Sequence, residues 1–198
     1  MSHYYEFDQN LDRSEFEISF DLHGQSFQLF SSAGVFSKEG LDTGSRILIE
    51  AVLDHALPSH NVLDLGCGIG VIGVALAHFW KCPVVGIDPN SQACYLANKN
   101  YARYQIDATV HENDHIEEDL GLFDTIVLNP PIRTGKKVIY SLFEQSARHL
   151  TQDGSLWIVI RKQHGAQSAW DYLQSLGLTC KRVVRDKGFW VIQATKTN

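Results

Sequence analysis

Residues 61–70 read NVLDLGCGIG, a short apolar run followed by a loop with a glycine at every second position. The apolar run predicts a buried strand, and Gly66, Gly68 and Gly70 allow the backbone to turn sharply and to approach a ligand closely. Open α/β sheets bind their ligands at this carboxyl end of the strands. The loop alone is ambiguous, because Gly68, Gly70 and Gly73 also satisfy the dinucleotide pattern G-x-G-x-x-G.

Apolar strand patterns and amphipathic helix patterns alternate after this loop. The alternation predicts a doubly wound, mostly parallel sheet with helices on both faces and right-handed crossovers. Strands are expected over 61–65, 83–88, 106–111, 122–128 and 154–161, and helices over 70–80, 91–103, 137–150 and 165–176. Two final apolar runs, 178–184 and 189–195, flank Arg185-Asp186-Lys187-Gly188, a hairpin signal that predicts one antiparallel edge strand.

The residues before the glycine loop predict an N-terminal extension. Alternating apolar residues over 16–30, around His23-Gly24-Gln25, predict a β-hairpin, residues 31–44 a loop, and residues 43–57 a helix. The helix is expected to bury Ile47, Leu48, Ala51, Val52 and His55 and to be stopped by Pro58. A chain of 198 residues suits a single core. We therefore expect one structural unit, with residues 1–45 as hairpin and substrate-side loop and residues 46–198 as the α/β domain.

Composition restricts the class of protein. There is no apolar run of membrane length and no charged-then-apolar leader, so the expectation is a cytoplasmic protein without membrane partners. The four cysteines (Cys67, Cys82, Cys94 and Cys180) lack metal-ligand spacing, so no metal site is expected. Net charge is −6, yet residues 1–130 hold 6 Lys and Arg against 19 Asp and Glu, whereas residues 131–198 hold 11 against 4. The basic C-terminal third is either a phosphate-facing surface or a solvated face.

Acidic residues near the glycine loop help to identify its ligand. Asp64 would repel the pyrophosphate of a dinucleotide, but S-adenosylmethionine carries cationic sulfonium and ammonium groups that tolerate it. The alternative is that Asp64 is a capping or turn residue. Asp88 ends the next predicted strand, at the position where nucleoside-binding sheets hold a ribose diol. Asp114, after the third strand, is a candidate acceptor for an adenine amine.

An Asn-Pro-Pro turn, Asn129-Pro130-Pro131, ends the fourth predicted strand. Each proline fixes φ and restricts the residue before it, so the turn is stiff. The side-chain oxygen of Asn129 and the carbonyl of Pro130 can then direct two acceptors at one amine, with its lone pair aimed at a methyl donor. We expect these two residues to be catalytic, although an isolated Asn-Pro is also a common turn.

Together these residues resemble the class I, Rossmann-like methyltransferases that modify planar amines through an Asn/Asp-Pro-Pro-aromatic motif. The resemblance is closer to the methyltransferase small domain group, which includes ribosomal RNA small-subunit guanine-N2 methyltransferases, and it runs from about Phe30 to the C-terminus. It implies a seven-stranded sheet, guanine in ribosomal RNA or the small ribosomal subunit as substrate, and S-adenosylmethionine as cofactor. The cofactor contacts that it implies are Asp64, Gly66, Gly68, Gly70, Asp88, Asp114 and Asn129.

One position departs from the motif: Ile132 stands where the family has an aromatic residue that stacks on the target base. Such stacking contributes about 1–3 kcal/mol, and Phe36 is the candidate to supply it, unless it only anchors its own loop. Substrate contacts are expected from Phe36, Pro131, Ile132, Arg133 and Lys136. A phosphate-binding patch is expected from Arg133, Lys136, Lys137, Arg161, Lys162 and His164.

Several alternatives stay open at the level of sequence. The same chemistry suits adenine, cytosine or a protein glutamine amide as acceptor. An NAD(P)-binding oxidoreductase and a non-catalytic RNA-binding scaffold are alternatives from other classes, and the chain is expected to act as a monomer or a homodimer.

Overall fold

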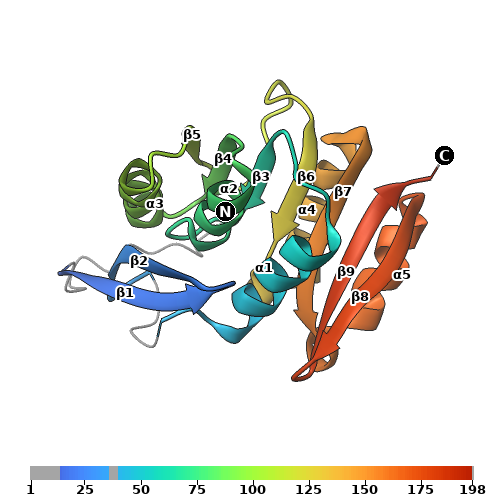
Figure 1. Ribbon diagram of the computed structural model, residues 1–198. Helices are drawn as coiled ribbons and strands as arrows, with labels where there is room; N and C mark the ends of the chain where they lie inside the picture. The colour runs from blue at the N-terminus through green and yellow to red at the C-terminus, as the bar shows by residue number, and fades with distance from the viewer. Residues whose placement is uncertain (1–13, 36–39, 198) are drawn as a thin grey trace.

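The structure, a computed structural model, describes residues 14–35 and 40–197 (Figure 1). Its strands are β1 Glu15–Leu22, β2 Gln25–Ser32, β3 Val62–Leu65, β4 Val84–Asp88, β5 Ala108–Glu112, β6 Phe123–Leu128, β7 Leu150–Arg161, β8 Leu178–Asp186 and β9 Phe189–Lys196. Its helices are α1 Thr43–His55, α2 Val71–Trp80, α3 Ser91–Arg103, α4 Lys136–Arg148 and α5 Ala166–Ser175, with 3-10 turns at Ile132–Thr134 and Lys162–His164. Among these residues no helix is both long and apolar enough to cross a membrane.

The main sheet has seven strands in the order β5-β4-β3-β6-β7-β9-β8. Neighbouring strands from β5 to β7 are parallel, and β9 is antiparallel to both β7 and β8. This confirms the expected doubly wound, mostly parallel sheet. The expectation that the antiparallel strand lies at the edge is wrong, because β9 lies between β7 and β8. After the crossover through α5, β8 lies two positions from β7 in the sheet. The tight turn at Lys187 and Gly188, both with positive φ, then brings β9 back between β7 and β8.

Helices cover both faces of this sheet, as Figure 1 shows. One buried cluster joins α1, α2, α3 and the hairpin to the sheet, and the other joins α4 and α5 to the opposite face. The two faces alternate along β6, where Val127 belongs to the first cluster and Leu128 to the second. Of the residues expected to be buried on α1, His55 alone is exposed, because the helix ends there and no further turn packs over it.

The connection from α4 to β7 differs from the sequence expectation. The helix ends at Arg148, and β7 begins at Leu150 rather than at residue 154, so the Asp153-Gly154 pair lies inside the strand. The register shifts there between β6 and β7, which is the signature of a β-bulge. A side chain at Gly154 would place its Cβ 2.8 Å from the Phe123 carbonyl oxygen, so the glycine permits this close approach.

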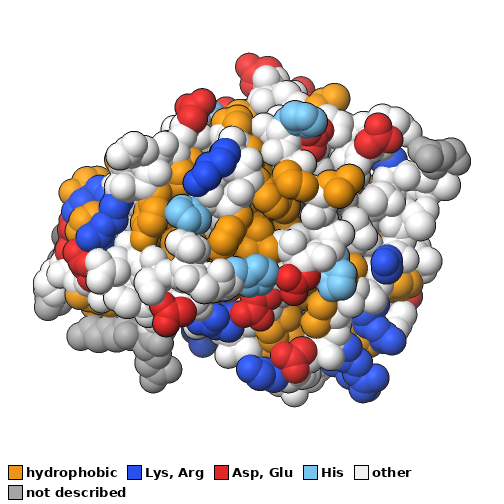
Figure 2. Space-filling view, viewed as in Figure 1, with side chains coloured by type: hydrophobic (Ala, Val, Ile, Leu, Met, Phe, Trp, Pro, Cys, Tyr) orange, Lys and Arg blue, Asp and Glu red, His pale blue; other side chains and the backbone are white. Residues whose placement is uncertain are grey.

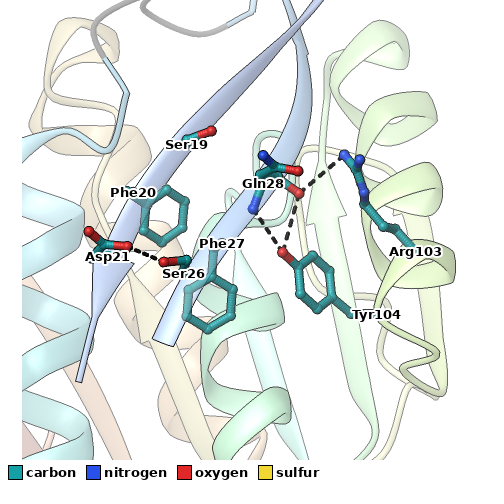
Figure 3. Close-up of a pocket in the computed structure, with 8 residues that line it drawn as sticks. All are labelled: Ser19, Phe20, Asp21, Ser26, Phe27, Gln28, Arg103 and Tyr104. Atoms are coloured by element: carbon teal, nitrogen blue, oxygen red, sulfur yellow. Dashed lines mark hydrogen bonds between the residues drawn. The ribbon is translucent and has the colours of Figure 1, made fainter. Parts of the chain in front are cut away.

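The hairpin β1–β2 forms a separate two-stranded sheet that docks on α3. The buried side chain of Asn100 accepts from the Phe30 N–H at 2.7 Å and donates to the Phe30 carbonyl at 3.0 Å, as a neighbouring strand would do. Nearby, the Tyr104 hydroxyl accepts from the Gln28 N–H at 2.8 Å, and Arg103 reaches the Gln28 carbonyl (Figure 3). α1 starts at Thr43, so the proposed division at residue 45 falls inside a helix, and the domain boundary stays a prediction.

Candidate active site

The glycine loop presents open backbone at the carboxyl end of β3. Gly66 and Gly68 have positive φ angles of 72° and 54°, and nothing lies within 4 Å of a Cβ built on either. The loop is tied to the neighbouring strand, because the N–H groups of Gly66 and Cys67 donate to the Ile87 carbonyl at 2.8 and 2.9 Å. Gly70 lies deeper, against the Tyr101 ring, and begins α2. The loop is therefore fixed to β4, while the space above Gly66 and Gly68 is open.

Asp64 lies beneath this loop, with only 1% of its surface exposed. Its Oδ2 accepts from the Gly73 N–H in the first turn of α2 at 2.8 Å, so the capping alternative describes its local contact. Its Oδ1 has no hydrogen-bond partner among the described residues, and neither has the buried Tyr101 hydroxyl. Burial raises the pKa of Asp64 to about 7, opposed by the Gly73 N–H and reinforced by the charge of Asp88.

Asp88 stands at the end of β4 beside the glycine loop. Its two carboxylate oxygens accept from the N–H groups of Gly68 and Asn90, each at 2.9 Å. Burial raises the pKa of Asp88, although both N–H groups act in the opposite direction. The loop after β5 also reaches this point, since the Asn113 N–H donates to the Asp88 carbonyl at 3.1 Å. Asp114 follows on that loop with a largely exposed side chain that contacts His115.

The Asn129 side chain lies at the tip of β6 and is held from a distant part of the chain. Leu65 and Leu128 are paired at the ends of β3 and β6. Gly66 follows the first and Asn129 follows the second, so the two residues lie at adjacent strand ends. Asn129 Nδ2 donates to Ser45 Oγ at 3.2 Å, and the Ser45 N–H donates to the N-cap residue Asp42 at 2.9 Å. The amide nitrogen is a donor, so Oδ1 is the acceptor that this side chain offers to a ligand.

The rest of the turn after β6 is rigid and partly buried. Pro130 is buried, and Pro131 accepts at its carbonyl from both the N–H and the hydroxyl of Thr134, at 3.0 and 2.7 Å. No described residue donates to the Pro130 carbonyl, which leaves it available as the second acceptor. Ile132 is half-buried and packs against the cluster under α4 and α5.

The other expected substrate contacts are placed around the same edge of the sheet. Arg133 and Lys136 are exposed after β6, and Lys136 reaches Ser168 at 3.4 Å. Phe36 lies outside the described residues. Within the described parts of the chain, no group of His, Cys, Asp or Glu is arranged to hold a metal ion.

Two residues that position the site were not identified from the sequence. Ser45 lies in the helix predicted over 43–57 and no role was expected of it, yet its hydroxyl accepts from Asn129, which lies 84 positions away. Asn100 is fully buried on α3 and donates to the Ile69 carbonyl of the glycine loop at 2.8 Å, in addition to its contacts with Phe30. A polar residue on the apolar face of a predicted helix was the available signal, since buried amides are almost always hydrogen-bonded.

Comparison with known proteins identifies the family. The sequence profile of the methyltransferase small domain matches residues 26–193. The chain is 38% identical over 198 residues to Uncharacterized protein YbxB of Bacillus subtilis (strain 168), covering 98% of each chain. It is 35% identical over 140 residues to Ribosomal RNA small subunit methyltransferase C of Haemophilus influenzae (strain 86-028NP), covering 68% of this chain and 42% of that relative.

The chain thus spans less than half of that Haemophilus relative. Among solved structures, the T. Thermophilus 16S rRNA N2 G1207 methyltransferase (RsmC) in complex with AdoMet and Guanosine aligns with a TM-score of 0.78 at 23% identity, covering 92% of this chain and 51% of that chain. This likeness shows the shared class I fold. With most of its length matched by the family profile, the chain belongs to the methyltransferase small domain family.

Proposed function

We propose that this protein transfers a methyl group from S-adenosylmethionine to an exocyclic amine, and that the amine is N2 of a guanine in ribosomal RNA. The observation that carries the proposal is the placement of Asn129 and Pro130 directly beside the glycine loop, at the ends of paired strands. We infer that two oxygen acceptors, Asn129 Oδ1 and the Pro130 carbonyl, face the place where the family binds its methyl donor.

The residues around the glycine loop fit this cofactor. Open space lies above Gly66 and Gly68, where a Cβ would meet nothing, so a ligand can approach the backbone itself. Asp88 stands at the end of β4, where a carboxylate can accept from ribose hydroxyls. Asp64 places a carboxyl group beneath the loop, and its buried Oδ1 has no hydrogen-bond partner among the described residues. Gly70 and Asp114 complete the proposed cofactor contacts.

The geometry at Asn129 suits a delocalised amine. When bound, S-adenosylmethionine supplies an electrophilic methyl group. An amine on a purine ring is a weak nucleophile because its lone pair is shared with the ring. Asn129 Oδ1 and the Pro130 carbonyl can accept its two hydrogens, which favours a tetrahedral nitrogen and stabilises the positive charge that develops there. The fixed turn also orients the amine for in-line attack.

An RNA substrate is favoured by the names of the relatives and by the charge distribution. The matched relatives named as ribosomal RNA methyltransferases support an RNA substrate, as do the exposed cations Arg133, Lys136 and Lys137 beside the turn. Adenine, cytosine or a glutamine amide would need the same acceptor pair. Identification of the methylated nucleoside separates these cases.

The test compares wild-type protein with Asn129→Ala, using ribosomal RNA and small subunits from cells that lack the protein. We expect N2-methylguanosine by mass spectrometry of the wild-type product. The variant should lose on the order of 10²- to 10³-fold in kcat, the effect of removing one preorganised polar group, while calorimetry shows that S-adenosylmethionine still binds. Asn98→Ala, an exposed asparagine on α3, is the matched control. Full turnover by Asn129→Ala with cofactor bound would contradict the proposal.

A further inference from the structure

Among the described residues, the position of the base-stacking residue in the family motif is held by an aliphatic side chain. Ile132, which stands at the aromatic position, is half-buried against the α4 and α5 side of the sheet. An aliphatic side chain committed to that cluster cannot offer a flat surface to a purine. If the acceptor is a base, a planar group other than residue 132 must supply the stacking surface.

A planar pair lies at the carboxyl end of β7. Arg161 is the last residue of β7 and pairs directly with Phe189, the first residue of β9. The Arg161 guanidinium carbon lies 4.3 Å from the centre of the Phe189 ring, so the cation lies over the ring in a cation–π contact. Arg161 is half-buried, and no carboxylate or carbonyl among the described residues pairs with its guanidinium. A cation held flat, with its donors unused, is poised for a ligand rather than for stability.

This pair adjoins the proposed acceptor site through Gly44. A Cβ built on Gly44 would lie 3.2 Å from Cε1 of Phe189 and 3.6 Å from Nδ2 of Asn129. The aromatic ring and the amide thus pack on the same residue at the N-terminus of α1. A Cβ at Gly44 would be in tight contact with the Phe189 ring and in ordinary van der Waals contact with the Asn129 amide, so both groups lie against this one residue.

We propose that Arg161, held flat by Phe189, is the surface on which the acceptor base stacks, in place of the aromatic residue that Ile132 does not supply. The inference rests on the proposed methyl transfer to a base. Guanidinium planes stack on nucleobases as aromatic rings do, and Arg, unlike Lys, keeps a flat delocalised charge. Arg161 would act on substrate binding, because a stacked base is held in both the ground state and the transition state.

The alternative role for Arg161 is a contact with an RNA phosphate, and Arg161→Lys separates the two. Lysine keeps the positive charge but has no plane. If Arg161 stacks on the base, Arg161→Lys and Arg161→Met should both raise KM for RNA by roughly 5- to 150-fold, the range of base stacking. The value of kcat should stay within about threefold of wild type, since uniform binding affects KM alone. Cofactor affinity should not change.

Arg182→Lys is the matched control. The guanidinium carbon of Arg182, on β8, lies 4.5 Å from the centre of the Trp190 ring, on the opposite face of the sheet from Phe189. It should leave KM unchanged. If Arg161→Lys retains wild-type KM, whether or not Arg161→Met does, the stacking proposal is overturned. If wild-type protein binds S-adenosylmethionine but methylates no base, the proposed function itself has failed, which is a distinct result.

Discussion

Asn129 illustrates how one side chain acquires a defined orientation. The two prolines after it stiffen its backbone, but they do not decide which way the amide points. That choice is made by Ser45, whose buried hydroxyl accepts from Nδ2 and leaves Oδ1 facing the site. The same serine is fixed at its own N–H by Asp42. The amide proposed to be catalytic is thus held by a helix N-terminus that lies far away in the sequence.

Replacement of Ser45 by Ala should therefore reduce turnover without loss of cofactor binding. A single hydrogen bond contributes about 0.5–1.5 kcal/mol, so we expect kcat to fall by roughly 2- to 13-fold. Steady-state methylation of RNA and calorimetric S-adenosylmethionine binding measure the two effects. Ser26→Ala, which removes an exposed hairpin hydroxyl bonded to Asp21, is the control. Equal kcat values for Ser45→Ala and wild type would show that the contact does not orient Asn129.

Asp64 makes the stability of the unliganded protein depend on pH. Its pKa rises from 3.8 to about 7 on folding, mainly through burial. The folded state therefore holds a proton that the unfolded chain has already released between about pH 4 and pH 7, so this carboxyl lowers stability as pH rises through that range. Above pH 7 its contribution is constant. Asp88 is half-buried and its pKa is also raised, so it contributes in the same direction.

We expect Asp64→Asn to remove this component of the pH dependence. The asparagine oxygen can still accept from the Gly73 N–H, and the neutral amide carries no charge that burial would penalise. Relative to wild type, the variant should gain stability progressively from pH 4 to pH 7, reaching on the order of a few kcal/mol. Urea unfolding without cofactor across this range measures the difference. Parallel pH profiles for the two proteins would count against a buried carboxyl with a raised pKa.

At the scale of elements, the hairpin is joined to the α/β unit by side chains rather than by the main sheet. Asn100 on α3 bonds both backbone groups of Phe30 and also the Ile69 carbonyl in the glycine loop. Lys99 and Arg103 flank this contact, with Lys99 paired to Glu15 and Arg103 to Glu17. Figure 3 shows the adjoining contacts at Gln28. One buried amide therefore links the hairpin, α3 and the cofactor loop.

Asn100→Ala should loosen the hairpin and the glycine loop together. It leaves the Phe30 N–H and two carbonyls without their partner in a buried setting, where each lost bond costs about 1–3 kcal/mol. We expect a lower free energy of unfolding and faster amide hydrogen exchange in both β2 and residues 66–70. The exposed Asn98→Ala on the same helix should change neither. Exchange that accelerates in β2 alone would mean that Asn100 does not couple the two segments.

At the scale of the whole molecule, charge is distributed along the functional edge of the sheet. Figure 2 shows Lys and Arg side chains gathered at the lower right, around the turn end of β8 and β9. Exposed cations follow three strands at this edge: Arg133, Lys136 and Lys137 after β6, Lys162 after β7, and Arg185 and Lys187 at the end of β8. The last two extend the patch predicted from the sequence. An acidic protein can thus present one basic edge to phosphate groups.

Neutralising this edge should weaken RNA binding mainly at low salt. Each phosphate contact contributes about 0.7–0.9 to the slope of log affinity against log salt. The triple change Lys137→Gln, Lys162→Gln and Lys187→Gln should therefore reduce that slope by about 2. Lys81→Gln, at the opposite, amino-terminal edge of the strands, should leave it unchanged. Filter binding from 50 to 300 mM salt measures the slopes, and equal slopes for both variants would exclude this edge as the RNA contact.

Local sequence was sufficient for much of this protein. The glycines of 66–70 need only their own backbone freedom, the Asn-Pro-Pro turn needs only the geometry of proline, and the alternation of apolar periods predicts a parallel sheet whose strand ends meet at one edge. Because Asp64, Asp88 and Asn129 each end a strand or adjoin its end, their assembly followed from that rule.

Tertiary structure alone decided the partners of these residues. Ser45 meets Asn129, Arg161 meets Phe189 and Asn100 meets Phe30 only after distant segments pack together. The insertion of β9 between β7 and β8 has the same origin, since a hairpin signal specifies a turn but not which neighbour each strand will pair with. A hydrogen bond or a stacking contact forms only when the two segments are positioned to within a few tenths of an ångström of each other. No local pattern in the chain encodes such relative positions.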